Sequence, residues 1–431
     1  MINTKDKIIE YFHSGIKKTK NFKIGIEHEK FLFDNKTNKR IDYFKINKMF
    51  KALLEFGWNP IFEKNNIIGL NKSGKNITLE PGNQIELSGE KLNHLHEACA
   101  ESQDYLFELK QVTKKLDLSI VSVGFDPISK LSEVPNNPKQ RYKLMTKDMP
   151  QGGELSLDMM YRTCGTQLNI DYDSEKDFVK KFKVVNSIVP ISIALFANSS
   201  IVEKKKSKYL SYRSKVWQNT SRGGLPKLFF EELDFEKYTD FIINFPILFI
   251  QGKKNYFSGK KYIFKDFMNG KIQEIDKRLP NENDLSTHLS TIFTENRLKK
   301  YIELRSMDTC GWDCLCAGPA FNVGLLYGNL DEVYELISKW DKDKIINAYI
   351  EAPQKGFNTQ LMGKDLLYWA STLLKLSSRG LEKRDILNKN GKNEILFLNH
   401  LKKIIDNKTT NADHMIDRFS KNEDLNELYD K

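Results

Sequence analysis

Four stretches of this chain place polar residues two positions apart within otherwise apolar runs. Alternate side chains of a β-strand point to opposite faces, so each such pair shares one face of a sheet. Carboxylates on a common face repel and desolvate one another unless cations neutralise them. Oxygen ligands suit Mg²⁺, which in enzymes usually accompanies phosphates, so the pattern predicts a sheet face that holds magnesium and a phosphate-bearing substrate. The residues are Glu27 and Glu29; Glu80, Gln84 and Glu86; Gln167 and Asn169; and Glu303 and Arg305.

The second of these stretches is less regular than the others. Pro81 and Gly82 interrupt "LEPGNQIELSG", so only Gln84 and Glu86 are firmly expected on one face, and the placement of Glu80 is open. Each pair taken singly is a weak signal, because an exposed edge strand explains two glutamates equally well. Together they form a constellation that chance produces less readily.

Several arginines lie in or near these stretches. An arginine fork binds carboxylate or phosphate through two hydrogen bonds. Arg305 is the strongest candidate because it shares a strand face with Glu303. The others would equally serve in surface ion pairs, and Trp217 would line a pocket or anchor its loop. These other arginines are Arg162, Arg213, Arg222 and Arg297.

The order of predicted elements favours an α+β fold. Strand-like segments concentrate before about residue 306, and helical periodicity dominates from residue 317 onward. The 431 residues contain no internal repeat or low-complexity linker. We therefore expect a catalytic core over residues 1–330 and a helical C-terminal part over 331–431, packed on the same domain. The polar segment 203–226 reads as a long loop, which in a compact domain is more often functional than idle.

The chain is basic, with a net charge of +11 and a pI of about 9.0. Lysine is spread along it and no dense basic run is interleaved with aromatics. Solvated lysines are therefore favoured first, an anionic substrate second and nucleic acid third. The longest uncharged run, 184–202, is interrupted by Asn186, Pro190 and Asn198. A buried core helix kinked at Pro190 fits this run better than a membrane span.

Composition also bears on the expected compartment. The N-terminal segment carries Asp6 and Glu10 and has no long apolar core, so it is not a secretory signal, and it lacks the character of a mitochondrial presequence. Five cysteines at irregular spacing suit a reducing compartment rather than a disulfide scaffold. A cytoplasmic protein is therefore expected.

Two motif matches fail in context. The segment 69–76, "GLNKSGKN", nearly matches the phosphate loop, but Asn76 lacks the hydroxyl that holds Mg²⁺, and a strand-like run follows where a helix is required. We predict a hairpin turn there. Cys310, Cys314 and Cys316 fit neither zinc nor iron–sulfur spacing, so ordinary thiols are expected.

Eight segments in this order resemble the plant-type glutamate–cysteine ligases, which also occur in proteobacteria. The resemblance implies a glutamine-synthetase-like core, in which a curved, mostly antiparallel sheet flanked by helices forms a funnel-shaped active site that holds Mg²⁺ and ATP. The segments run from about residue 24 to 328 and are "GIEHEKFLF", "LEPGNQIELSG", "LHEACAE", "LDMMYRTCGTQLN", "PISIALFANS", "YRSKVWQNT", "TIFTENRLKKYIELR" and "CAGPAFNVGLLY".

The resemblance also implies roles for individual residues. The metal ligands would be Glu27, Glu29, Glu86 and Glu303, assisted by Glu80 and Gln167. The nucleotide would be contacted by Asn169, Arg297 and Arg305, and Arg305 would stabilise the transferred phosphoryl group. The glutamate substrate would be held by Arg162, Arg213 and Trp217. The motifs leave open how the ligands divide among metal sites.

The chain departs from the plant members in two respects. It lacks their N-terminal transit region, which favours a cytoplasmic bacterial enzyme. Their regulatory disulfide uses a thiol next to the motif matched by "CAGPAF", where Cys316 stands, but its partner should fall near Glu274, where this sequence has no cysteine. That redox switch is therefore not expected here.

The reaction implied is the first step of glutathione biosynthesis. ATP phosphorylates the γ-carboxylate of L-glutamate, and the amine of L-cysteine attacks the acyl phosphate to give γ-glutamylcysteine. We expect no nucleic-acid or membrane partner, and a monomer or homodimer. Three alternatives stay open: a γ-glutamyl ligase with a different amine acceptor, a basic RNA-binding protein with structural acidic strands, and a redox-sensing thiol protein built on the cysteines of 310–316.

Overall fold

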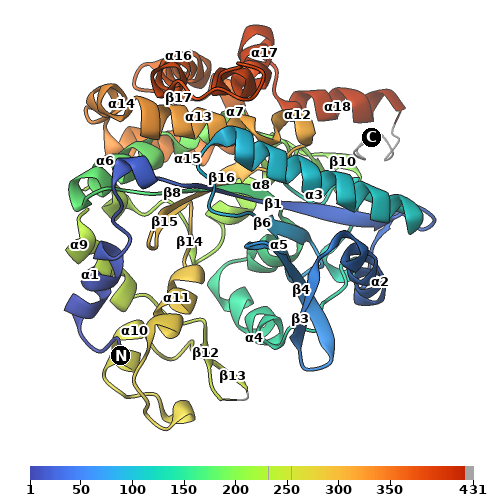
Figure 1. Cartoon of the computed structure of the whole chain (residues 1–431), viewed down its shortest axis with the longest axis vertical. Coiled ribbons are helices and arrows are strands. Elements are labelled where there is room, and N and C mark those ends of the chain that lie inside the picture. Colours follow the sequence, from blue (N-terminus) through green and yellow to red (C-terminus); the bar gives the residue numbers. More distant parts are fainter. Residues whose placement is uncertain (232, 254, 423–431) are drawn as a thin grey trace.

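The fold is built on one large antiparallel sheet with helices packed against it (Figure 1). The computed structural model describes residues 1–231, 233–253 and 255–422. The main path of the sheet follows the order β15-β16-β8-β1-β6-β5-β4-β3, while β2 and β7 also pair with β1. The strands are β1 Ile24–Asp34, β2 Lys39–Arg40, β3 Asn59–Glu63, β4 Asn66–Lys72, β5 Lys75–Leu79, β6 Ile85–Ser88, β7 Leu118–Val121, β8 Gly165–Ile170, β15 Asn296–Leu298 and β16 Ile302–Asp308.

The α+β class is confirmed by the order of elements. The large sheet is complete at Asp308, and helices dominate the described chain after it. The residues 423–431 of the predicted C-terminal part lie outside the described residues. The helices that follow the large sheet are α12 Trp312–Leu315, α13 Ala317–Val323, α14 Leu330–Ile337, α15 Lys342–Lys355, α16 Leu366–Arg384, α17 Asn399–Asn407 and α18 Asn411–Asn422.

The apolar face of the sheet lies under helices from both halves of the chain. Ile26, Leu168 and Leu304 occupy adjacent positions on β1, β8 and β16, and all three belong to the main hydrophobic cluster. The same cluster contains Phe321 of α13 and Leu373 of α16. Figure 1 shows the C-terminal helices together with α3 (Leu95–Lys115) on this side of the sheet. Because side chains alternate along a strand, the odd-numbered neighbours of these residues on β1 and β8 face the other way.

The opposite, polar face is surrounded by smaller elements. They are α4 (Gln140–Asp148), α5 (Ser156–Arg162), α11 (Glu282–Ser290) and the hairpin of β12 (Phe249–Gln251) and β13 (Tyr256–Ser258). Figure 1 shows α4, α11 and this hairpin on the side of the sheet away from the C-terminal helices. The elements leave a cavity over the middle of the sheet, described below.

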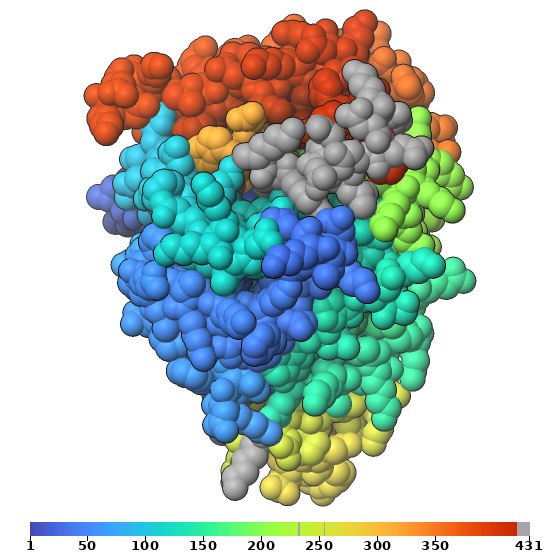
Figure 2. Space-filling model, turned by 90° about the vertical axis from the view of Figure 1, so that its right-hand side faces the viewer, coloured from blue at the N-terminus to red at the C-terminus, as the bar shows by residue number. Residues whose placement is uncertain are grey.

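The hydrophobic core continues across residue 330. Leu325 and Leu326 before this position, and Val333 and Ile337 after it, belong to one cluster. In the space-filling view the C-terminal helices form a band across one end of the molecule (Figure 2). The core is thus continuous across residue 330, while the change from strands to helices comes earlier, after Asp308.

Of three segments whose local structure was predicted, one agrees with the structure and two differ from it. The 69–76 segment forms the hairpin of β4 and β5, as expected. The 203–226 segment is not simply a loop, because it contains α8 (Tyr212–Gln218), whose N-cap Ser211 accepts a hydrogen bond from the Ser214 amide. The 184–202 run holds two helices rather than one kinked helix, since Pro190 lies in the first turn of α7 (Val189–Leu195). Among the described helices, none combines the length and the apolarity that crossing a membrane requires.

Candidate active site

The polar face of the sheet gathers side chains from four adjacent strands. The antiparallel register places Glu29 opposite Glu86. On the other side of β1, Glu27 lies opposite Gln167, and Asn169 is in turn opposite Glu303. Residues directly opposite on antiparallel strands have Cβ atoms about 4.5–5.5 Å apart. The polar residues predicted from four separate stretches are therefore neighbours in space.

Amide side chains tie these carboxylates to β8. Gln167 donates through Nε2 to Glu29 Oε1 at 3.2 Å, and Asn169 donates through Nδ2 to Glu27 Oε1 at 2.6 Å. The Gly165 amide donates to Glu29 Oε2 at 2.6 Å. The two amide oxygens, Gln167 Oε1 and Asn169 Oδ1, are buried and accept no hydrogen bond within the described structure. Two unsatisfied acceptors thus adjoin two half-buried carboxylates.

Burial makes ionisation of these carboxyl groups unfavourable. Desolvation and the nearby Glu80 raise the pKa of Glu29 to about 7. Desolvation and Glu303 raise the pKa of Glu27, and desolvation and Glu80 raise that of Glu86 well above its usual range. A cation placed among them would relieve this cost.

The donor set fits a hard cation such as Mg²⁺. Carboxylate and amide oxygens are the ligand types that it prefers. The unpaired oxygens of Gln167 and Asn169 supply acceptors that nothing else in the described structure uses. In the described part of the chain, no three His, Cys, Asp or Glu side chains already stand close enough together to hold a metal ion. Metal binding would therefore require the carboxylates to draw together.

Glu303 differs from the other glutamates because cations already surround it. Arg297 approaches it through two hydrogen bonds of 2.8 Å, Arg305 through one of 2.5 Å, and Lys299 Nζ lies 3.1 Å away. These cations hold the pKa of Glu303 well below its usual range, against the opposing effect of burial. As it stands, Glu303 organises the basic groups of the site.

A cavity of about 370 Å³ opens over this face. From the sheet, its wall includes Glu27, Glu29, Glu86, Gln167 and Arg305. Glu80 reaches it from the turn between β5 and β6, where its amide donates to the Gln84 carbonyl. Facing the sheet are Arg141, Tyr142 and Met145 of α4, Phe249 of β12, Ser286, Thr287 and Ser290 of α11, and nearby Thr291 and Phe293.

No pattern in the sequence pointed to the α4 side of this cavity. Arg141 lies in "QRYKLM", which shows no sustained alternation of polar and apolar residues. Its guanidinium donates to the Tyr142 hydroxyl at 3.2 Å, and interactions with Tyr142 and with Glu80 raise the pKa of Arg141. Lys299 was missed for a similar reason, since one lysine among many in a basic chain carries no pattern.

The residues predicted to hold glutamate have different surroundings. Arg213 and Trp217 of α8 lie directly behind the cavity wall, where Trp217 packs edge-on against Phe293 and the Arg305 guanidinium lies 5.1 Å from its ring centre. Arg162 is outside the cavity lining and pairs with Asp158 at 2.9 Å and Glu203 at 3.2 Å. This geometry gives no support to a substrate role for Arg162.

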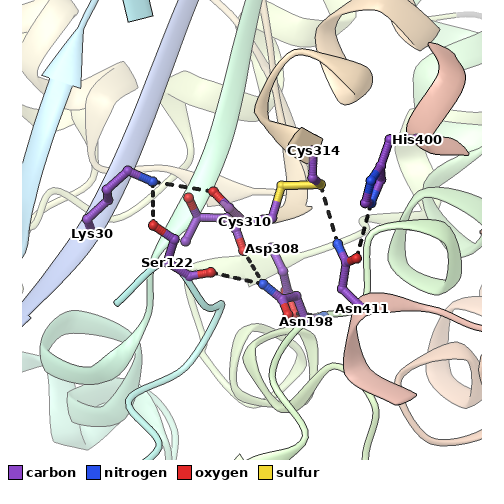
Figure 3. The surroundings of a disulfide bond; sticks show 9 residues. Lys30, Ser122, Asn198, Asp308, Cys310, Cys314, His400 and Asn411 are labelled. Carbon is purple, nitrogen blue, oxygen red and sulfur yellow. Dashed lines mark hydrogen bonds between the residues drawn. A yellow bond between two sulfur atoms is a disulfide. The ribbon is translucent and has the colours of Figure 1, made fainter. Parts of the chain in front are cut away.

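The prediction of ordinary thiols is wrong for Cys310, Cys314 and Cys316, which all form disulfides. Cys310 bonds Cys314, and Cys316 bonds Cys99 of α3, while Cys164 is a buried free thiol. Figure 3 shows the Cys310–Cys314 bridge with Asn411 of α18 beside it, whose amide donates to Cys314 Sγ at 3.4 Å. A larger cavity of about 650 Å³ adjoins this bridge, and no carboxylate of the polar face lines it.

The fold and this acidic face agree with the chain's family. The family model described as glutamate-cysteine ligase family 2 matches residues 23–431. The chain belongs to this family of ligases.

Two plant enzymes are similar to this chain over most of its length. The chain is 39% identical over 422 residues to a chloroplastic glutamate–cysteine ligase B of Oryza sativa subsp. japonica, covering 96% of this chain and 84% of that protein. It is 38% identical to the chloroplastic glutamate–cysteine ligase of Nicotiana tabacum, covering 96% and 80%. These comparisons therefore favour the ligase over the redox-sensor and RNA-binding alternatives.

Solved structures share the fold at low sequence identity. The glutamate–cysteine ligase of Francisella tularensis, solved in complex with AMP, matches with a TM-score of 0.55 at 15% identity, covering 94% of this chain and 86% of that one. A bifunctional glutathione synthetase from Pasteurella multocida matches with a TM-score of 0.51 at 12% identity, covering 98% of this chain and 53% of that one.

The expectation of a cytoplasmic protein is contradicted by these comparisons. The plant relatives named above are chloroplastic enzymes, as is the relative from Arabidopsis thaliana. The argument from the N-terminal segment and the cysteine content therefore fails as a guide to location.

Proposed function

We propose that this chain carries out the reaction of its family on the acidic sheet face. It is an ATP-dependent glutamate–cysteine ligase, which joins the γ-carboxylate of L-glutamate to the amine of L-cysteine and so performs the first step of glutathione biosynthesis. A free carboxylate is a poor electrophile, and transfer of the γ-phosphoryl group of ATP supplies the leaving group. The amine then displaces phosphate from the acyl phosphate. The AMP bound to the Francisella tularensis relative supports the use of an adenine nucleotide here.

One observation carries the assignment to this face. Unpaired acceptors and unpaired donors stand side by side in one buried place: Gln167 Oε1 and Asn169 Oδ1 lack a donor, and Arg305 Nε lacks an acceptor within the described structure. Acceptors beside carboxylates call for a cation, and an arginine donor calls for an anion. Magnesium and a phosphate group satisfy both requirements together.

The metal would be held by the carboxylates of β1 and β6. Glu27, Glu29 and Glu86 are the ligands that we propose, with the amide oxygens of Gln167 and Asn169 completing the set. Glu80 lies close enough to raise the pKa of Glu29 and Glu86, so it belongs to the same group of charges. When bound, Mg²⁺ supplies neutralisation of the carboxylates and of the triphosphate.

The basic residues would act on the phosphoryl group. Arg305 lines the cavity, and its charge would stabilise the transferred group as negative charge spreads over its oxygens. Arg297 holds Glu303, and Glu303 in turn orients Arg305. Phosphoryl transfer asks a protein chiefly for positioning and charge neutralisation, which this arrangement provides.

The glutamate carboxylates would meet cations at the cavity wall. Arg141 on α4 is the candidate that the structure adds, because its side chain lines the cavity opposite the sheet. Arg213 and Trp217 would support the same substrate from behind the wall. We leave Arg162 out of this set, since two carboxylates already engage it.

The direct test is phosphate release from purified protein. We expect release to require Mg²⁺, ATP, glutamate and an amine, and to collapse when any one is omitted. A panel of amino acids in place of cysteine tests which amine is the acceptor. If cysteine is not preferred, the protein is a related γ-glutamyl ligase with another acceptor. Phosphate release that does not depend on glutamate would overturn the proposal. The same preparation, run by analytical ultracentrifugation, decides between monomer and homodimer.

A further inference from the structure

Arg305 stands at an irregularity in β16. The register between β16 and β8 shifts between Leu304 and Met307, so Arg305 and Ser306 together oppose the single residue Gln167. A bulge of this kind removes main-chain groups from the ladder, and buried main-chain groups need partners elsewhere. The main chain around Arg305 therefore needs partners other than β8.

Two residues supply the missing partners. The Arg305 amide donates to the main-chain carbonyl of Glu295 at 2.9 Å. The Arg305 carbonyl accepts from Arg213 Nη2 at 2.7 Å. The main chain of Arg305 is thus held from both sides, by the residue just before β15 and by a side chain of α8.

Arg213 lies close to a buried acid. Its Nη1 lies 4.0 Å from Asp308 Oδ1. The Asp308 carboxylate accepts hydrogen bonds from the main-chain amide of Asn198 at 2.9 Å, from the Ser199 hydroxyl at 2.7 Å and from the Ser211 hydroxyl at 2.9 Å. Figure 3 shows Asp308 next to Asn198, at the end of β16. Asp308 is 2% exposed, so solvent weakens these contacts little.

Glu295 is fixed from the helical C-terminal part. The hydroxyl of Tyr349, on α15, donates to Glu295 Oε1 at 2.8 Å, and Glu295 is 1% exposed. The Tyr349 carbonyl accepts from Gln218 Nε2 of α8 at 2.6 Å. The Pro353 carbonyl, near the end of α15, accepts from the Leu210 and Ser211 amides just before α8. Helix α15 therefore contacts both arms that hold Arg305.

We propose that Glu295 and Asp308 are positioning residues for Arg305, and that Tyr349 carries this function into the helical C-terminal part. Two buried carboxylates flank two guanidinium groups, and each carboxylate is oriented by hydroxyl donors. Burial raises the pKa of both Glu295 and Asp308, and the nearby Arg213 guanidinium opposes this effect without reversing it. This inference rests on the proposed role of Arg305 in phosphoryl transfer.

Tyr349→Phe tests the inference by removing one oxygen atom. We expect kcat to fall about 10-fold, because losing a hydrogen bond to a buried charged group shifts an equilibrium by roughly that factor or more. The KM values for glutamate, cysteine and ATP should change less than about twofold, since misplacing Arg305 affects the transition state more than substrate binding. Tyr327→Phe is the matched control, because its hydroxyl also bonds inside the protein, to the Lys23 carbonyl, away from Arg305.

Two further variants separate positioning from general stability. Glu295→Gln and the double variant Glu295→Gln/Tyr349→Phe complete a double-mutant cycle, in which we expect the two losses of kcat to be strongly non-additive. A normal kcat for Tyr349→Phe, or additive losses, would overturn the inference. If Arg305→Ala itself leaves kcat intact, the proposed function of Arg305 fails, whatever Tyr349→Phe shows.

Discussion

Arg297 and Glu303 meet through two parallel hydrogen bonds of 2.8 Å across the β15–β16 pair. This bidentate contact, together with Lys299 and Arg305, leaves Glu303 fully neutralised before any ligand arrives. Glu27, Glu29 and Glu86 have no comparable cation at hydrogen-bond distance in the described structure. One polar face therefore carries a basic half beside β16 and an acidic half beside β1 and β6.

Replacing Arg305 by alanine should affect the chemical step. We expect kcat to fall on the order of 10³-fold, in line with the contribution of an arginine that acts on a transferred phosphoryl group. The KM for glutamate should rise far less. Steady-state kinetics with each substrate varied in turn measures both quantities, and a normal kcat would show that the role is misassigned.

Glu29→Gln should change the requirement for magnesium. The amide keeps the shape of the side chain but removes a charge from the proposed ligand set, so the folded variant should need on the order of tenfold or more Mg²⁺ for half-maximal activity. A titration of activity against Mg²⁺ at fixed ATP measures this shift. An unchanged midpoint would remove Glu29 from the ligands.

The raised pKa of Glu29 predicts how stability depends on pH without metal. Its carboxyl group titrates near 4.5 when exposed and at about 7 in the folded protein. Between these values the folded state binds a proton that the unfolded state has released, so the free energy of unfolding should decrease as pH rises through this window. The contribution of one group is at most about 1.4 kcal/mol per pH unit and vanishes above pH 7.

Urea unfolding in the presence of a chelator, at pH values on both sides of this window, measures the effect. The Glu29→Gln protein should lose this part of the pH dependence, because glutamine does not titrate. If both proteins show the same slope between pH 5 and about 7, the carboxyl group of Glu29 is not the source.

Gly165→Ala should disturb Arg213. A Cβ atom at this position would stand 2.7 Å from Arg213 Nη2, the atom that donates to the Arg305 carbonyl. We expect kcat to fall about tenfold and the free energy of unfolding to fall by about 1–3 kcal/mol, a typical cost of overpacking. Gly25→Ala on β1 is the comparison for stability, since the nearest atoms to its added Cβ would lie 3.5 Å away. Equal stability of the two variants would contradict the crowding.

The cysteine pairing has a chemical test. The native protein is alkylated without reductant and digested, and peptide mapping should then give one peptide pair that joins Cys99 to Cys316 and a bridge between Cys310 and Cys314. A second sample, reduced before alkylation, should show neither bond. Cys164 should be alkylated only after unfolding, because it is buried and burial raises the pKa of its thiol. Any other pairing would contradict the structure.

Predictions from local pattern were accurate where the physics is local. The alternation in "GIEHEKFLF" and "TCGTQLNIDY" determines which side chains share a face, and Glu27, Glu29, Gln167 and Asn169 do so. Their roles as ligands remain predictions, which the Mg²⁺ titration tests. The substrate role of Arg162 also remains a prediction; Asp158 is its neighbour on one helix, whereas Glu203 reaches it only when the chain folds.

Contacts between distant segments were beyond the reach of local pattern. The Cys99–Cys316 bond, which spans 217 residues, does not follow from any periodicity. The same holds for the place of Arg141 in the cavity wall and for the contact of Tyr349 with Glu295. Each depends on how helices dock on the sheet. The bulge at Arg305 is equally hidden, since it depends on the register of β16 against β8.

By itself, the sequence determined the family, the α+β order of elements and the polar face of each strand, because side-chain alternation is a property of the backbone at every residue. Only the tertiary structure decided which carboxylates stand together, which one is already neutralised, and which helix supports Arg305. Charge interactions and desolvation depend on distances through space, and those distances exist only once strands far apart in the chain have paired.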